Sequence, residues 1–137
     1  MLVHAVDEHS PFHGRCLDRL EAWRALAAAW YTTWPVLYEF LRIITHPRVL
    51  RRPWAAPKAW TFVEALLASP GLGVLVPTDR HAAVAKQVLD EVPGIGGNLM
   101  HDAHTAVLMR EHGIRRIYTR DTGFHRFPFL EPIDPVS

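Results

Sequence analysis

The sequence has 137 residues and a formal net charge of +1, and it is 49% hydrophobic and 21% charged. These values are ordinary for one folded domain, and they exclude a disordered chain, a collagen and a coiled coil. The single cysteine, Cys16, excludes a disulfide framework and a thiolate zinc cluster and points to a reducing, cytoplasmic setting. The sequence contains no apolar run long enough to span a bilayer, so we expect no membrane association. The first residues reach Asp7 without the basic and apolar regions of a signal peptide, so we expect none.

The predicted elements begin with an apolar run, Leu2–Val6, which we interpret as a short buried strand. Apolar residues at helical spacing from Phe12 through Ala27 then predict a long amphipathic helix over roughly 11–29. The later elements, in chain order, are a helix from Trp34 to His46, an Arg- and Pro-rich loop over 47–57, a helix over 58–69, a strand over 73–77, a helix from Thr78 to about Val92, a helix from Asn98 to Gly113, a strand over 114–119, a turn over 121–127 and a short strand over 130–133.

Apolar strands separated by helices predict an α/β sandwich with a mostly parallel sheet, and we treat residues 1–137 as a single domain. Active groups in such sheets gather beyond the carboxyl ends of the strands. The residues that follow Val6, Val76 and Tyr118 are therefore the first places to look for chemistry.

Three carboxylates are candidates. Asp121 follows a predicted strand, although an aspartate in a turn often bonds only its own backbone. Asp102 lies near the start of a helix, where the helix dipole favours an acid without any function. Glu39 lies on a strongly apolar helix, three residues before Arg42, and the two side chains could simply pair on the surface.

Separated carboxylates of this kind suggest a site for magnesium or manganese, because hard divalent cations prefer oxygen ligands. Two such ions about 3.5–4 Å apart can activate water and stabilise the leaving oxygen of a phosphodiester. Histidine pairs, His9 with His13 and His101 with His104, offer a rival metal site but lack an HExxH-type motif. Cys16 lies on the apolar face of its helix and is interpreted as a core residue.

Four segments together resemble the PIN-domain proteins of the VapC toxin type, and the resemblance extends from Met1 to about Pro135. These segments are LVHAVDEHSPFH (2–13), WPVLYEFLRIITHPRV (34–49), GNLMHDAHTAVLMREHG (97–113) and IYTRDTGFHRFPFLEPIDP (117–135).

The resemblance implies a PIN-like α/β/α sandwich and a magnesium- or manganese-dependent endoribonuclease, the toxin of a type II toxin–antitoxin system. Glu39, Asp102 and Asp121 match the family's acidic metal ligands, Thr119 matches an accompanying hydroxyl, and Arg42 matches an arginine that would contact substrate phosphate. The implied partners are RNA, a cognate VapB-like antitoxin and a second copy of the chain in a homodimer.

The sequence departs from the family at two places. Gly123 stands where the family has a second aspartate, so an auxiliary ligand is lost there. Met1 stands at the valine position of the family's opening D-x-N-V-L, which leaves the first expected strand truncated and a central aspartate missing, and Asp7 matches a different position. The alternative function is therefore a catalytically impaired PIN fold that binds an antitoxin or RNA, and an in-frame D-x-N in the DNA upstream of Met1 would argue against it.

Overall fold

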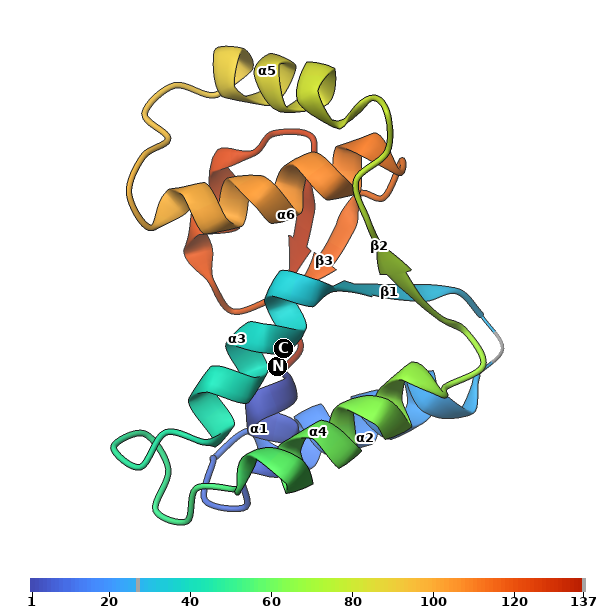
Figure 1. Cartoon of the computed structure of the whole chain (residues 1–137), viewed down its shortest axis with the longest axis vertical. Coiled ribbons are helices and arrows are strands. Elements are labelled where there is room, and N and C mark those ends of the chain that lie inside the picture. Colours follow the sequence, from blue (N-terminus) through green and yellow to red (C-terminus); the bar gives the residue numbers. More distant parts are fainter. Residues whose placement is uncertain (27, 137) are drawn as a thin grey trace. The chain divides into compact units, whose positions relative to one another are not determined.

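The computed structural model describes residues 1–26 and 28–136 (Figure 1). Its elements, in chain order, are α1 (Leu2–Val6), α2 (His13–Ala25), β1 (Trp30–Thr33), α3 (Trp34–Ile44), α4 (Ala56–Leu67), β2 (Leu72–Leu75), α5 (His81–Glu91), α6 (Leu99–Glu111), β3 (Arg116–Tyr118), the 3-10 helix η1 (Thr122–Arg126) and β4 (Glu131–Ile133). No helix of the described residues has the length and apolar character needed to cross a membrane.

These residues form two compact units, which we describe separately. Unit 1 consists of Met1–Val74 with the residues from Pro135 onward, and unit 2 is Leu75–Asp134. A single domain over residues 1–137 stays a prediction.

Unit 1 is built mainly from helices. In α3, Pro35 follows the N-cap residue Thr33, whose hydroxyl oxygen accepts a hydrogen bond from the Val36 N–H at 3.2 Å. This is the combination of cap and early proline that starts a helix well. The apolar face of α3, with Leu37 and Ile44 fully buried, packs with α4 in one core cluster. Cys16 is completely buried in a second cluster, which confirms that it is a core residue.

Unit 2 joins two helices to a pair of parallel strands. In Figure 1, α5 lies along α6, and the two helices share a core in which Val88 and Ala106 are fully buried. Gly113 has φ +72° and ends α6, with the Ile114 N–H donating to the Met109 carbonyl at 2.8 Å. The chain then enters β3, which pairs in parallel with β4 so that Ile117 lies opposite Pro132. The turn after β3 therefore lies at the carboxyl end of a parallel strand.

The prediction of a strand over Leu2–Val6 is wrong, because this segment forms the helix α1. The Ala5 N–H donates to the Met1 carbonyl at 3.1 Å, and the Asp7 N–H donates to the Val3 carbonyl at 2.9 Å. A short apolar run fits a buried helical turn as well as a buried strand, so its periodicity does not separate the two. The helical turn places Ala5 in one core cluster and Val3 against the other. The truncated first strand that we expected is therefore not formed by these residues.

The predicted helix over 11–29 is shorter in the structure, where α2 spans His13–Ala25. Leu26 adopts an extended conformation at its end, and residue 27, which the prediction included, lies outside the described residues. Aromatic and β-branched side chains then favour the strand β1, Trp30–Thr33, which the sequence analysis does not predict. The predicted α/β class is confirmed, while the strands of the described residues form two two-stranded sheets, β1–β2 and β3–β4.

Candidate functional site

Asp121 lies in the turn that follows β3. Its Oδ1 accepts a hydrogen bond from the Gly123 N–H at 2.8 Å and caps η1. The Thr119 hydroxyl oxygen accepts a hydrogen bond from the Asp121 N–H at 3.0 Å, so Thr119 holds the backbone that carries the carboxylate. Both residues line a small cavity of about 120 Å³ that also includes His125. The local bonds are those of an ordinary aspartate turn, but they leave the carboxylate at an accessible hollow.

Asp102 lies in the first turn of α6 and is partly buried. A polar stripe on this helix runs from His101, which is exposed, to Thr105, which is buried. Asp102 therefore lies at the point where this stripe enters the packed part of unit 2.

Asp102 and Asp121 approach each other across Gly123. A Cβ atom built on Gly123 would lie 2.7 Å from Asp102 Oδ2 and 3.1 Å from Asp121 Oδ1, which places both carboxylates beside the same backbone atom. Burial, the neighbouring charge of Asp121 and a hydrogen bond between the two carboxyl groups raise the pKa of Asp102, and the charge of His101 opposes them in part. The tertiary structure thus brings together two of the three predicted acids.

Glu39 and Arg42 lie in unit 1, on α3. Arg42 donates two hydrogen bonds to the Glu39 carboxylate, from Nη2 at 2.6 Å and from Nε at 3.1 Å. The hydrogen bond and the charge of Glu39 raise the pKa of Arg42. Both side chains are more than half exposed, so this pair contributes little to stability. The convergence of Glu39 with the two aspartates of unit 2 stays a prediction.

The histidine pairs form no site of their own. His104 packs edge-on against His81, with ring centroids 5.8 Å apart. Burial, followed by the charges of His81 and His101, lowers the pKa of His104 and favours its neutral form. Among residues 1–26 and 28–136, no group of three His, Cys, Asp or Glu side chains is arranged to hold a metal ion.

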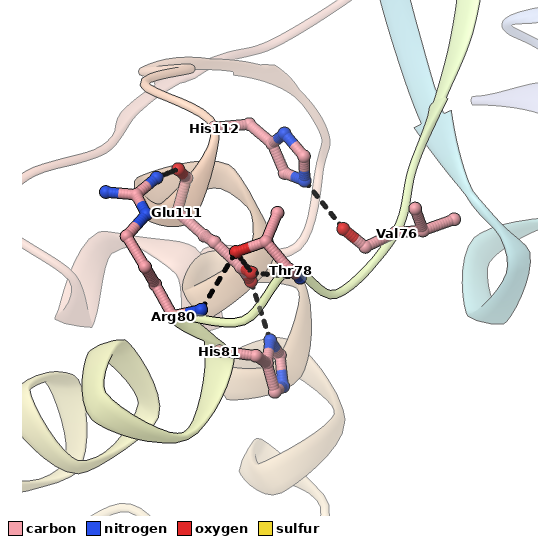
Figure 2. Close-up of polar contacts among 6 residues, drawn as sticks. All are labelled: Val76, Thr78, Arg80, His81, Glu111 and His112. Carbon is pink, nitrogen blue, oxygen red and sulfur yellow. Dashed lines mark hydrogen bonds and ion pairs between the residues drawn. The ribbon is translucent and has the colours of Figure 1, made fainter.

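Sequence analysis missed Glu111, whose side chain is completely buried at the end of α6 (Figure 2). Its Oε2 accepts hydrogen bonds from the N–H and the hydroxyl of Thr78, and its Oε1 accepts one from His81 Nδ1 at 2.6 Å. Burial would raise the pKa of Glu111, but the hydrogen bonds from Thr78 and His81 outweigh it and lower the pKa to about 2. Glu111 stands between two polar residues, Arg110 and His112, so nothing in the sequence distinguishes it from a surface acid. The partners themselves were not visible in the sequence.

Comparison with known proteins yields a family and named relatives. The model of the PIN domain family matches residues 1–130. The chain is 35% identical over 137 residues to Ribonuclease VapC48 of Mycobacterium tuberculosis, covering 100% of this chain and 94% of that protein. It is 32% identical over 140 residues to Ribonuclease VapC33 of the same species, covering 99% of this chain and 94% of that protein. It is also 35% identical over 127 residues to Ribonuclease VapC37, covering 93% and 87% respectively.

Proposed function

The chain belongs to the PIN-domain family, in its VapC branch, and on this basis we propose that it is a metal-dependent endoribonuclease, the toxin of a type II toxin–antitoxin pair. The observation that carries the proposal is the approach of Asp102 to Asp121 beside Gly123. These two acids lie 19 positions apart in the sequence, so only the fold of unit 2 brings them together.

Divalent magnesium or manganese fits the donor set at this pair. Two adjacent carboxylates supply hard oxygen ligands, and their mutual repulsion, which contributes to the raised pKa of Asp102, is relieved by a cation. In our proposal, Asp102 and Asp121 hold the ion with Glu39 as a further ligand. A bound ion of this kind lowers the pKa of a coordinated water and stabilises negative charge on the phosphodiester.

The protein's own contribution is to position these groups. Thr119 fixes the backbone of Asp121 through the hydrogen bond from the Asp121 N–H, which holds the carboxylate at the end of β3. In our proposal, Arg42 binds a non-bridging phosphate oxygen of the RNA, because a guanidinium presents several donors in one plane. Its hydrogen bonds to Glu39 keep both side chains oriented on α3 until substrate binds.

The alternative function, a catalytically impaired PIN fold that binds an antitoxin or RNA, is not favoured. The relatives that align with the whole chain are named ribonucleases. We also propose a VapB-like antitoxin and a homodimer as the partners, which the family resemblance supports.

The experiment is cleavage of a fluorescently labelled single-stranded RNA by the purified chain, freed of antitoxin, in MgCl2, in MnCl2 and in EDTA. We expect cleavage only with metal, and we expect Asp102→Asn and Asp121→Asn each to lower the rate at least about 100-fold, a loss of about 2.7 kcal/mol of transition-state stabilisation. The matched control is Asp18→Asn, at an exposed position of α2, prepared identically. Cleavage that persists in EDTA, or that survives Asp102→Asn at the rate of the control, would contradict the proposal.

A further inference from the structure

The segment between α3 and α4 and its two flanking helices carry an unbalanced positive charge. From Phe40 to Val63 the chain contains no acidic residue and five cations, Arg42, Arg48, Arg51, Arg52 and Lys58. All five side chains belong to exposed residues of unit 1. We use the name basic loop for Arg48, Arg51 and Arg52, which lie between α3 and α4, together with Lys58 in the first turn of α4. A local cluster of this sign attracts polyanions even though the net charge of the chain is only +1.

Most of this charge is not neutralised by acids of the chain. Within the part of the chain that the structure describes, Arg48, Arg51 and Arg52 make no ion pair. The Lys58 ammonium lies 4.3 Å from the centroid of the Trp54 ring, so its nearest described partner is an aromatic face and not a carboxylate. The guanidinium groups of the basic loop are therefore accessible to anionic ligands from solution.

Beside the basic loop lies an open, apolar groove of about 520 Å³ between α3 and α4. Tyr38 and Trp60 line it, and Arg42 and Thr45 supply its polar edge. Tyr38 is 61% exposed and Trp60 is 38% exposed, which is unusual for such large apolar rings. Trp60 is also stacked on Trp34, with an interplanar angle of 14° and centroids 6.3 Å apart, so the rings are held in a defined orientation.

Flat aromatic faces interleaved with guanidinium groups are suited to single-stranded nucleic acid, in which unpaired bases stack on the rings and the phosphates contact the cations. A duplex hides its base faces and would engage only the cations. Tyr38, Glu39 and Arg42 lie within about one turn of α3. If an RNA base stacks on Tyr38, the sugar–phosphate backbone of that RNA therefore lies close to Glu39, the proposed catalytic residue.

We propose that the groove and the basic loop form a base-stacking subsite for single-stranded RNA, which positions the strand next to Glu39. This inference rests on the proposed function for its connection to cleavage. The binding itself is measurable without metal and without catalysis.

The test is the affinity of the full chain for a fluorescent oligouridylate, measured by anisotropy in EDTA over a range of salt concentrations. We expect Tyr38→Leu and Trp60→Leu each to weaken binding about tenfold, the effect typical of losing one stacked base. The double variant Arg51→Gln/Arg52→Gln should weaken binding and reduce the slope of log K against log salt by about 0.7 for each arginine that contacts phosphate. Both loop arginines are exposed, so this variant does not depend on the packing around Trp60.

The matched controls are Tyr31→Leu, an exposed aromatic of β1, and Arg115→Gln, an exposed arginine of unit 2. Both should bind the oligonucleotide within twofold of the unchanged chain. Duplex RNA should respond to the arginine variant but not to Tyr38→Leu.

The inference is overturned if Tyr38→Leu and the double arginine variant both bind RNA like the controls. If RNA binds with the expected dependence but is cleaved neither in MgCl2 nor in MnCl2, the subsite stands and the proposed function fails. If cleavage depends on Asp102 while the groove variants cleave and bind normally, the proposed function stands and the subsite fails.

Discussion

Glu111 accepts a hydrogen bond from His81 at 2.6 Å, joining the last turn of α6 to the first residue of α5 across 30 positions of sequence. The carboxylate is completely enclosed, and the Thr78 N–H and hydroxyl bind its other oxygen (Figure 2). A buried charge is tolerated when hydrogen bonds satisfy it, and here they also fix how the two helices of unit 2 meet.

Replacing Glu111 by alanine should therefore destabilise the protein strongly. The change removes three hydrogen bonds to a buried carboxylate and leaves the Thr78 and His81 donors without it. We expect the free energy of unfolding to fall by about 3 kcal/mol. Urea denaturation at pH 7 measures it, with Glu64→Ala, an exposed position of α4, as the control. Equal stability of the two variants would show that the network does not support the fold.

Glu111 should also account for part of the decrease in unfolding free energy at low pH. Its pKa is about 2 in the folded state against an ordinary value of 4.5, so its contribution to stability is complete above pH 4.5 and is lost as the pH falls toward 2. Glu111→Gln should lower stability at pH 7 and flatten the decline of unfolding free energy between pH 5 and about 2.5. Chemical denaturation at several pH values tests this, and an unchanged slope in the variant would contradict the assignment.

Replacing Asp102 by asparagine should stabilise the metal-free protein and remove its response to metal. A raised pKa means that the ionised carboxylate is unfavourable in the folded state, so its contribution should lower stability as the pH rises from the ordinary pKa of 3.8 to the raised folded pKa and should not change further above it. At pH 7, Asp102→Asn removes this cost, and we expect Tm to rise by a few degrees. Thermal unfolding with and without MnCl2 measures both effects. A variant that gains as much Tm from MnCl2 as the unchanged chain would exclude Asp102 as a ligand.

Restoring the family's aspartate at position 123 should weaken metal binding. Asp102 Oδ2 lies only 2.7 Å from the place of a Cβ at Gly123, so any side chain there displaces the Asp102 carboxylate from its neighbour Asp121. We expect Gly123→Asp to reduce the Tm increase caused by MnCl2. The control is Gly96→Asp, which adds the same side chain where no atom lies within 4 Å. A larger increase in Gly123→Asp would show that the new carboxylate acts as a ligand.

Two glycines with open surroundings should respond to alanine in opposite directions. Gly113 has φ +72° at the end of α6, whereas Gly14 lies within α2, and neither has an atom within 4 Å of a built Cβ. Gly113→Ala should cost about 1 kcal/mol, because alanine is strained in the left-handed region. Gly14→Ala should stabilise by about 0.5–1 kcal/mol through helix propensity. Urea denaturation of the pair measures both, and a cost at Gly14 would contradict the helical assignment there.

Residues close together in the chain specify several of the individual helices and turns. Pro35 after a threonine cap, the glycine after α6 and the apolar spacing of α3 act within one or two helical turns, so α3, α6 and the turn at Asp121 could be predicted. The same locality explains the error at Leu2–Val6, where an apolar run this short has no period that separates a helix from a strand.

Which polar groups come into contact depends on the packing of whole elements. The approach of Asp102 to Asp121 depends on the packing of α6 against η1, and the absence of a side chain at Gly123 leaves the space for it. In the sequence, Glu111 is indistinguishable from a surface acid. The fold encloses its carboxylate and surrounds it with donors from Thr78 and His81. Contacts between residues far apart in the chain depend on how complete elements pack, and a single sequence records the spacing within each element but not the distance between them.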